Sequence, residues 1–141
     1  MENTQNEPLA DAHKRDGFVF PYDVVGKDEA GEIRADLEAG EAELRHRPDE
    51  LAMLRSYPDR LLPSFDKLIR NFRLIDAASQ ILGPDLKMFR NHLLLKPPQV
   101  GSQKGMHQDS PYWPIEPMDL CSCWFALDDA TVENGCMQVI P

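Results

Sequence analysis

The sequence predicts a mainly β protein with N-terminal helices (α+β), and two observations lead to this fold class. Apolar residues recur at helical spacing as far as Leu82, whereas beyond Gly83 they fall into short runs of strand length separated by turn signals. The composition, 42% apolar and 28% charged, is typical of a soluble globular protein with a buried core. A length of 141 residues suits a single domain.

The chain is expected to open with a tail and a short extended run. Residues 1–11 are polar and show no periodicity, so we expect a disordered polar tail outside the fold. Gly17-Phe18-Val19-Phe20 is a run of β type, and Pro21 stops it. The folded domain is therefore expected over residues 12–141.

Two helices are expected next. Asp28 is the predicted N-cap of a helix that extends to about Leu44, with an apolar stripe at Ala30, Ile33, Leu37 and Leu44. A second helix is expected over residues 64–82, where the apolar residues at helical spacing are Phe65, Leu68, Ile69, Phe72, Ile75, Ala78 and Leu82. Gly83-Pro84 is expected to end it, because glycine and proline are common just past a helix C-terminus.

The β-region is expected to begin at about residue 86. Strands are predicted over residues 86–96, 120–127 and 136–140. A loop rich in Pro, Gly and Gln, residues 97–105, follows the first of them, and Asn134-Gly135 is a strong turn signal before the last.

The charge balance disfavours several classes of partner. The chain carries 15 basic and 24 acidic residues, a net charge of -9, which would repel phosphate backbones and anionic lipid headgroups. No apolar run is long enough to span a membrane. We therefore expect a cytoplasmic protein that acts on a small molecule and binds neither nucleic acid nor a membrane.

The candidate chemistry lies at His107-Gln108-Asp109. On an extended backbone, residues i and i+2 project to the same side, so His107 and Asp109 could offer an imidazole nitrogen and a carboxylate oxygen to one metal ion. With 4 His and 14 Asp in the chain, chance gives about 0.4 such pairs, so a solvated loop pair is the competing interpretation. A second imidazole would complete the two-His, one-carboxylate triad typical of non-haem iron oxygenases.

A longer set of motifs resembles one family in order and spacing. These blocks are Leu94-Leu95-Lys96-Pro97-Pro98, His107-Gln108-Asp109, Tyr112-Trp113-Pro114, Asp119-Leu120, Cys123-Trp124 and Asn134-Gly135-Cys136-Met137-Gln138-Val139-Ile140-Pro141. They resemble the phytanoyl-CoA dioxygenase family of Fe(II)- and 2-oxoglutarate-dependent oxygenases. Residues 12–38 also resemble the start of that family, so the resemblance covers nearly the whole chain.

The resemblance implies roles for individual residues. His107 and Asp109 match the first two iron ligands of the family, while His92 and Trp124 match positions beside 2-oxoglutarate. His92 stands where members often have Met. Three neighbours of the ligands are candidates for lining the substrate pocket, although aromatic residues in such a turn more often simply pack: Gln108, Tyr112 and Trp113.

The resemblance also implies a reaction and a fold. The complete enzyme would use Fe(II), 2-oxoglutarate and O2 to hydroxylate a small-molecule metabolite with release of succinate and CO2. Its fold would be a double-stranded β-helix (a jelly roll of the cupin type), of which this chain would hold an incomplete part truncated at residue 141. We expect the exposed strand edges of that part to promote self-association.

Two family residues have no match within these 141 residues. They are the second iron-ligand His and the Arg that binds 2-oxoglutarate, and both follow the Val-Ile-Pro run in the family. Arg55 lies near the position of another basic residue that some members use, but no motif anchors it. We expect this chain to be the N-terminal part of a longer enzyme and to be inactive alone.

Two alternatives stay open. One is a non-catalytic pseudo-oxygenase that serves as a binding domain. The other is a zinc-binding module formed by Cys121, Cys123, Cys136 and His107, although the Cys-x-x-Cys spacing of zinc knuckles is absent and free cysteines are commonly buried. The substrate is not specified by the sequence.

Overall fold

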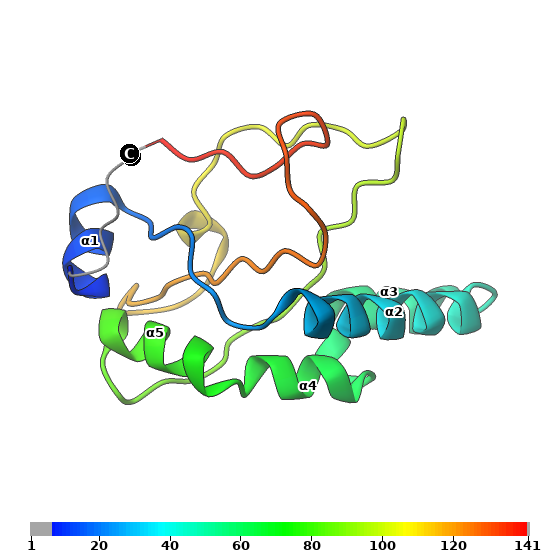
Figure 1. Ribbon diagram of the computed structural model, residues 1–141, viewed down its shortest axis with the longest axis horizontal. Helices are drawn as coiled ribbons and strands as arrows, with labels where there is room; N and C mark the ends of the chain where they lie inside the picture. Colours follow the sequence, from blue (N-terminus) through cyan, green and yellow to red (C-terminus); the bar gives the residue numbers. More distant parts are fainter. Residues whose placement is uncertain (1–6, 141) are drawn as a thin grey trace.

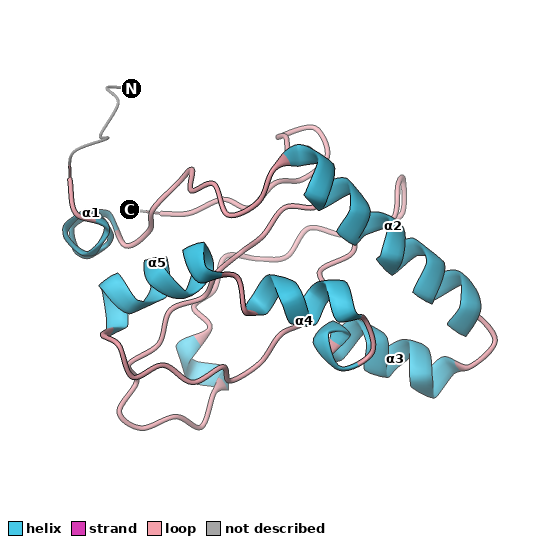
Figure 2. Cartoon of the chain, turned by 60° about the horizontal axis from the view of Figure 1, so that its bottom comes forward, coloured by secondary structure: helices cyan, strands magenta, loops and turns pink. Residues whose placement is uncertain are grey.

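The computed structural model describes residues 7–140, and this part of the chain is built from helices and loops (Figures 1 and 2). The α-helices are α1 (Leu9–Asp16), α2 (Lys27–Leu44), α3 (Pro48–Ser56), α4 (Pro63–Ile69) and α5 (Phe72–Leu82). Two single turns of 3-10 helix accompany them, η1 (Pro58–Arg60) and η2 (Ser110–Tyr112). None of the helices in residues 7–140 is long and apolar enough to cross a membrane.

The prediction of a mainly β fold is wrong for this structure, and so is the jelly roll that the resemblance implied. Residues 7–140 contain no strand, and the expected strands at 17–20, 86–96, 120–127 and 136–140 are loops. Extended backbone becomes a strand only where its N–H and C=O groups pair with those of a neighbour. Between residues 84 and 140, the backbone hydrogen bonds that are present close local turns, with one exception at Leu93.

The first expected helix corresponds to α2, Lys27–Leu44. Its N-cap is Gly26 rather than Asp28, and no side chain caps the free N–H groups. Asp28 and Glu29 lie in the first turn, where negative charge is favourable beside the helix N-terminus. Ile33 and Leu37, from the predicted apolar stripe, are buried.

The second expected helix, over residues 64–82, is divided into α4 and α5. The division has a local cause, because the Asn71 side chain accepts a hydrogen bond of 2.9 Å from the Arg73 backbone N–H and so caps a new helix. Phe65 and Leu68 of α4 are buried. The α5 helix ends at Leu82 before Gly83, whose φ of 93° favours glycine.

Two helices were not expected from the sequence. Helix α3 begins with Pro48, a residue that suits the first turn of a helix. Helix α1 takes in residues 9–11 of the expected disordered tail, while residues 1–6 lie outside the described part.

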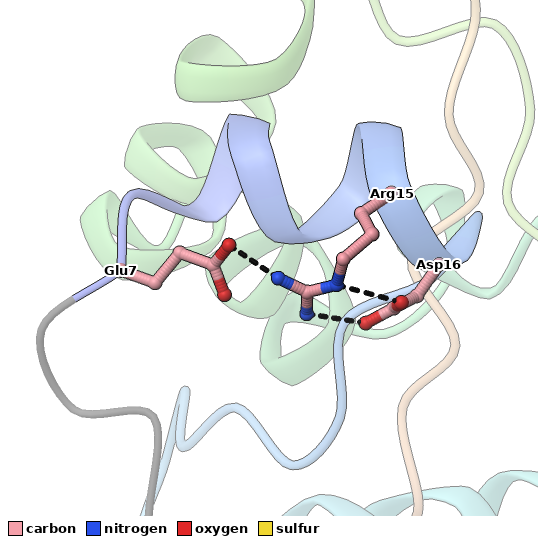
Figure 3. A network of polar contacts seen from close by, with 3 residues as sticks. All are labelled: Glu7, Arg15 and Asp16. Atoms are coloured by element: carbon pink, nitrogen blue, oxygen red, sulfur yellow. Dashed lines mark hydrogen bonds and ion pairs between the residues drawn. The ribbon is translucent and has the colours of Figure 1, made fainter.

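Figure 3 shows the Arg15 guanidinium between the carboxylates of Glu7 and Asp16, with Nε 2.9 Å from Asp16 Oδ1. These exposed ion pairs add little stability.

A small core joins α2, α3 and α4. Its six buried apolar residues are Val24, Ile33, Leu37, Leu54, Phe65 and Leu68, and Leu54 has no exposed surface. Gly40 of α2 permits close packing here, because a Cβ at this position would lie 3.3 Å from Leu62 Cδ2. Leu93, Phe125 and Leu127 pack against the same core from the loop region.

Polar contacts join the loop region to the helices, and one of them is the 3.4 Å hydrogen bond that Asn91 Nδ2 donates to Asp59 Oδ1 of η1. The Leu93 N–H donates a 2.8 Å hydrogen bond to the Arg55 carbonyl oxygen at the end of α3. Arg34 of α2 forms an ion pair with Asp128. Arg55 and Arg34 belong to the helices that build the core, so the loops containing the predicted site are held on it at both ends (Figure 1).

Replacing the fully buried Leu54 tests whether this core stabilises the fold. The variant Leu54→Ala is expected to lose about 2–5 kcal/mol of unfolding free energy, because it removes buried methyl groups and leaves a cavity. Urea unfolding followed by circular dichroism at 222 nm measures this loss. Met53→Ala is the matched control in α3, since Met53 is 47% exposed, and its effect should stay within about 0.5 kcal/mol. Equal losses in both variants would contradict the assigned core.

The loop region exposes an unusual number of large apolar side chains. They include Phe89, Leu94, Val100, Trp124, Val139 and Ile140. Because exposed apolar side chains favour association, the chain is expected to self-associate as its concentration rises. Sedimentation equilibrium should give an average mass above the 16.0 kDa of one chain. A monodisperse monomer over the whole concentration range would contradict this prediction.

Candidate functional site

The structure places His107 and Asp109 side by side on the loop that leads into η2. His107 Nε2 lies 3.4 Å from Asp109 Oδ1, and both side chains are close to half exposed, at 45% and 46%. Asp109 is the N-cap residue of η2, so its backbone turns into the 3-10 helix directly after the pair. Two donor atoms of different type therefore face one point that a ligand can reach.

A backbone carbonyl orients the imidazole. His107 Nδ1 lies 2.8 Å from the carbonyl oxygen of Gly105. Because a carbonyl oxygen can only accept, Nδ1 must be the protonated nitrogen in this contact, and in the neutral ring Nε2 then carries the free lone pair. The nitrogen that faces Asp109 is thus the one able to bind a metal ion.

Ser122 contacts the other oxygen of the carboxylate. Its hydroxyl lies 3.4 Å from Asp109 Oδ2, within reach of a long hydrogen bond. The two oxygens of Asp109 therefore have different neighbours, with Oδ1 beside His107 and Oδ2 beside Ser122. A contact of this kind restricts rotation of a carboxylate that binds a metal.

The donor pair fits a first-row divalent metal ion. Each nitrogen or oxygen ligand of such an ion lies about 2.1 Å from it, so two ligands can be at most about 4.2 Å apart. The observed 3.4 Å separation meets this limit. Within residues 7–140, no group of three or more His, Cys, Asp or Glu side chains is placed to hold a metal ion, so the fit rests on two donors.

The pair opens into a hollow of about 560 Å³. It is lined by Arg90, His92, Lys104, Gly105, Met106, His107, Asp109, Tyr112 and Trp113. Five of the seven residues predicted for the site line it, namely His92, His107, Asp109, Tyr112 and Trp113. The volume is that of a site for a small molecule.

Two predicted residues are not on the lining. Trp124 is 43% exposed and belongs to the loop region outside the hollow. Gln108 is exposed between His107 and Asp109. Arg55, which no motif anchored, forms an ion pair of 2.7 Å with Glu41 on the helical side of the molecule.

Aromatic side chains form one wall of the hollow. Trp113 packs on Phe89 with 5.4 Å between the ring centroids, and Tyr112 meets the His107 ring edge to face at 6.4 Å. Tyr112 is 73% exposed, so its ring is available to a ligand as well as to His107.

Sequence reasoning missed Arg90 and Lys104, which also line the hollow. Their influence is visible at His92, whose pKa is lowered first by burial and then by the positive charges of Arg90 and Lys104. Charged residues in loops are usually solvated, and no spacing rule links positions 90 and 104. Only the closeness of residue 90 to the predicted His92 could have suggested the first of them.

The zinc alternative finds no support in the described residues. Cys121, Cys123, Cys136 and His107 do not form a group able to hold a metal ion. Cys121 and Cys123 instead interact with each other, because a hydrogen bond from the Cys121 thiol lowers the pKa of Cys123 to about 7 and raises that of Cys121.

Two motif blocks distant in sequence are joined near the chain's C-terminal end. The Lys96 ammonium donates to the Gly135 carbonyl oxygen. Gly135 has a φ of 83°, and the Asn134 side chain accepts a 2.8 Å hydrogen bond from the Thr131 N–H, so Asn134-Gly135 forms a turn as the sequence predicted.

Comparison with known proteins identifies the family. The family model described as phytanoyl-CoA dioxygenase (PhyH) matches residues 13–141. The chain belongs to the phytanoyl-CoA dioxygenase family. The match includes every predicted site residue and the whole lining of the hollow.

Relatives in this family are named as dioxygenases. A probable phytanoyl-CoA dioxygenase of Caenorhabditis elegans is 27% identical over 77% of this chain and 36% of its own length. An ectoine dioxygenase of Streptomyces coelicolor is 27% identical over 90% of this chain and 47% of its own. The peroxisomal phytanoyl-CoA dioxygenase of Homo sapiens is 38% identical over 42% of this chain and 19% of its own.

The chain spans less than half the length of these curated relatives. No solved structure matches it.

The contact between the Cys121 and Cys123 thiols predicts a pH-dependent reactivity. Because the thiolate is the nucleophile, alkylation of Cys123 by iodoacetamide should accelerate as pH rises, with a midpoint at about pH 7. Peptide mass spectrometry after timed quenching measures the rate at each cysteine. In Cys121→Ala the lost hydrogen bond should move the midpoint upward. An unchanged midpoint in that variant would show that Cys121 does not control the pKa of Cys123.

Proposed function

We propose that this chain supplies the His-x-Asp half of the metal site in an Fe(II)- and 2-oxoglutarate-dependent dioxygenase. The observation that carries the proposal is the 3.4 Å separation of His107 Nε2 and Asp109 Oδ1 at the hollow, in a chain of a family whose relatives are named dioxygenases. The overall reaction would hydroxylate a small metabolite, with one oxygen atom of O2 entering the product and the other entering succinate as 2-oxoglutarate loses CO2.

The residues at the metal would have distinct tasks. Bound Fe(II) would supply the activation of O2 that protein side chains cannot provide. His107 would bind it through Nε2, with Gly105 holding the ring in the required tautomer, and Asp109 would bind through Oδ1 while Ser122 restrains Oδ2. These contacts fix the donor pair in advance, so less ordering is needed when the ion binds.

The other lining residues would place the reactants. Burial and neighbouring cations keep the pKa of His92 low, so its ring is neutral near pH 7 and can hydrogen-bond 2-oxoglutarate without adding charge. Trp113, held by Phe89, and Tyr112 offer apolar faces that would position a metabolite and exclude water beside the metal.

Metal binding by the donor pair tests this proposal. With Mn(II) as a probe for Fe(II), the free-ion EPR signal should fall on addition of protein, and His107→Ala or Asp109→Ala should weaken binding by at least about tenfold. His46→Ala is the control, because His46 is also exposed but lies between α2 and α3. Equal binding by all variants, or no binding at all, would instead favour the non-catalytic binding domain.

The 141 residues alone are expected to show no turnover. Two donors hold a metal ion weakly, so succinate release from 2-oxoglutarate with Fe(II) and O2 should remain at the level without protein. Robust succinate release would contradict the conclusion that the site has just two protein donors.

A further inference from the structure

We propose that Arg90 and Lys104 form a subsite for a carboxylate group, on the wall of the hollow that contains His107 and Asp109. The ligand class is a small carboxylic acid with an apolar part. The subsite is argued independently of the proposed function. The further statement that its carboxylate ligand is a reactant rests on the proposed function.

The first argument is charge. The lining holds two permanent cations, Arg90 and Lys104, and one carboxylate, Asp109, in a chain whose net charge is -9. Asp109 faces His107 and Ser122, and neither cation forms an ion pair within residues 7–140. The hollow is thus a locally positive region on an acidic protein, which attracts anions.

The second argument is the surroundings of the Arg90 guanidinium, which differ from those of the cations that form ion pairs. Ion pairs are formed by Arg15, Arg34, Arg47, Arg55, Arg70 and Lys67. Arg90 instead lies over the Tyr57 ring, with its guanidinium carbon 5.9 Å from the centroid. A ring face holds a guanidinium without using its N–H donors, so these remain available to a ligand.

The third argument is chemical fit. A guanidinium offers paired N–H donors that match the two oxygens of a carboxylate, and an ammonium adds a point charge beside them. Burial lowers the pKa of His92, and the positive charges of Arg90 and Lys104, which line the same hollow, lower it further. Met106, Tyr112 and Trp113 supply the apolar part of the lining, so an amphipathic acid fits better than a polyanion.

Binding of glutarate tests the subsite without metal. Glutarate has two carboxylates but no oxo group next to them, so in the presence of EDTA its binding reports on the cations alone. Trp113 lines the hollow, and its fluorescence in a Trp124→Phe background provides the signal. The neutral diamide glutaramide and inorganic phosphate are the comparison probes.

The expected result is saturable quenching by glutarate that weakens about tenfold in Arg90→Gln and in Lys104→Gln. Lys27→Gln removes the same charge from an exposed lysine outside the hollow and should leave binding unchanged. Circular dichroism checks that each variant is folded. Absence of quenching, equal binding of glutaramide, tighter binding of phosphate, or equal binding by all three variants would overturn the proposal.

A final arm identifies the source of the carboxylate. With Mn(II) present, displacement of glutarate by 2-oxoglutarate assigns the subsite to the co-substrate, and simultaneous binding assigns it to the substrate. If glutarate binds while Mn(II) does not, the subsite stands and the proposed function falls. If Mn(II) binds while glutarate does not, the proposed function stands and the subsite falls.

Discussion

The buried side chain of Leu54, enclosed where α2, α3 and α4 meet, is the interaction on which the rest of the structure depends. The core around it has six buried residues within 7–140, and Leu74 of α5 and Leu93, Phe125 and Leu127 of the loop region pack against it. Arg55, which follows Leu54, accepts a hydrogen bond from the Leu93 N–H. This contact holds the segment of Arg90 and His92, two residues that line the hollow, beside the core.

The donor pair itself is set locally. His107 and Asp109 lie two residues apart in the loop that turns into η2 at Asp109, whose φ of -73° and ψ of -35° are helical, and the Gly105 carbonyl selects the ring nitrogen that faces the carboxylate. This arrangement needs no sheet. It explains how a structure without strands in residues 7–140 can still present two metal donors to one hollow.

Features set by a few neighbouring residues could be predicted from the sequence, and features that need a second, distant segment of the chain could not. The apolar stripe of α2 and the turn at Asn134-Gly135 are encoded within a few residues, and so is the His-x-Asp juxtaposition. The break at Asn71 was missed because apolar spacing continues through it, although the side chain caps a new helix. Strands were expected where apolar runs are extended, but a strand also requires a second backbone at hydrogen-bonding distance.

Family membership and geometry support the same account from different directions. The phytanoyl-CoA dioxygenase family match covers residues 13–141, and the structure gathers five predicted residues around one hollow together with two cations that no motif indicated.

The central claim is that His107 Nε2 and Asp109 Oδ1 bind one metal ion. Crystals soaked anaerobically with Fe(II) and measured at the iron absorption edge test it most directly. The account predicts an anomalous peak within coordination distance of both atoms, and a peak elsewhere, or none at this pair, would contradict it.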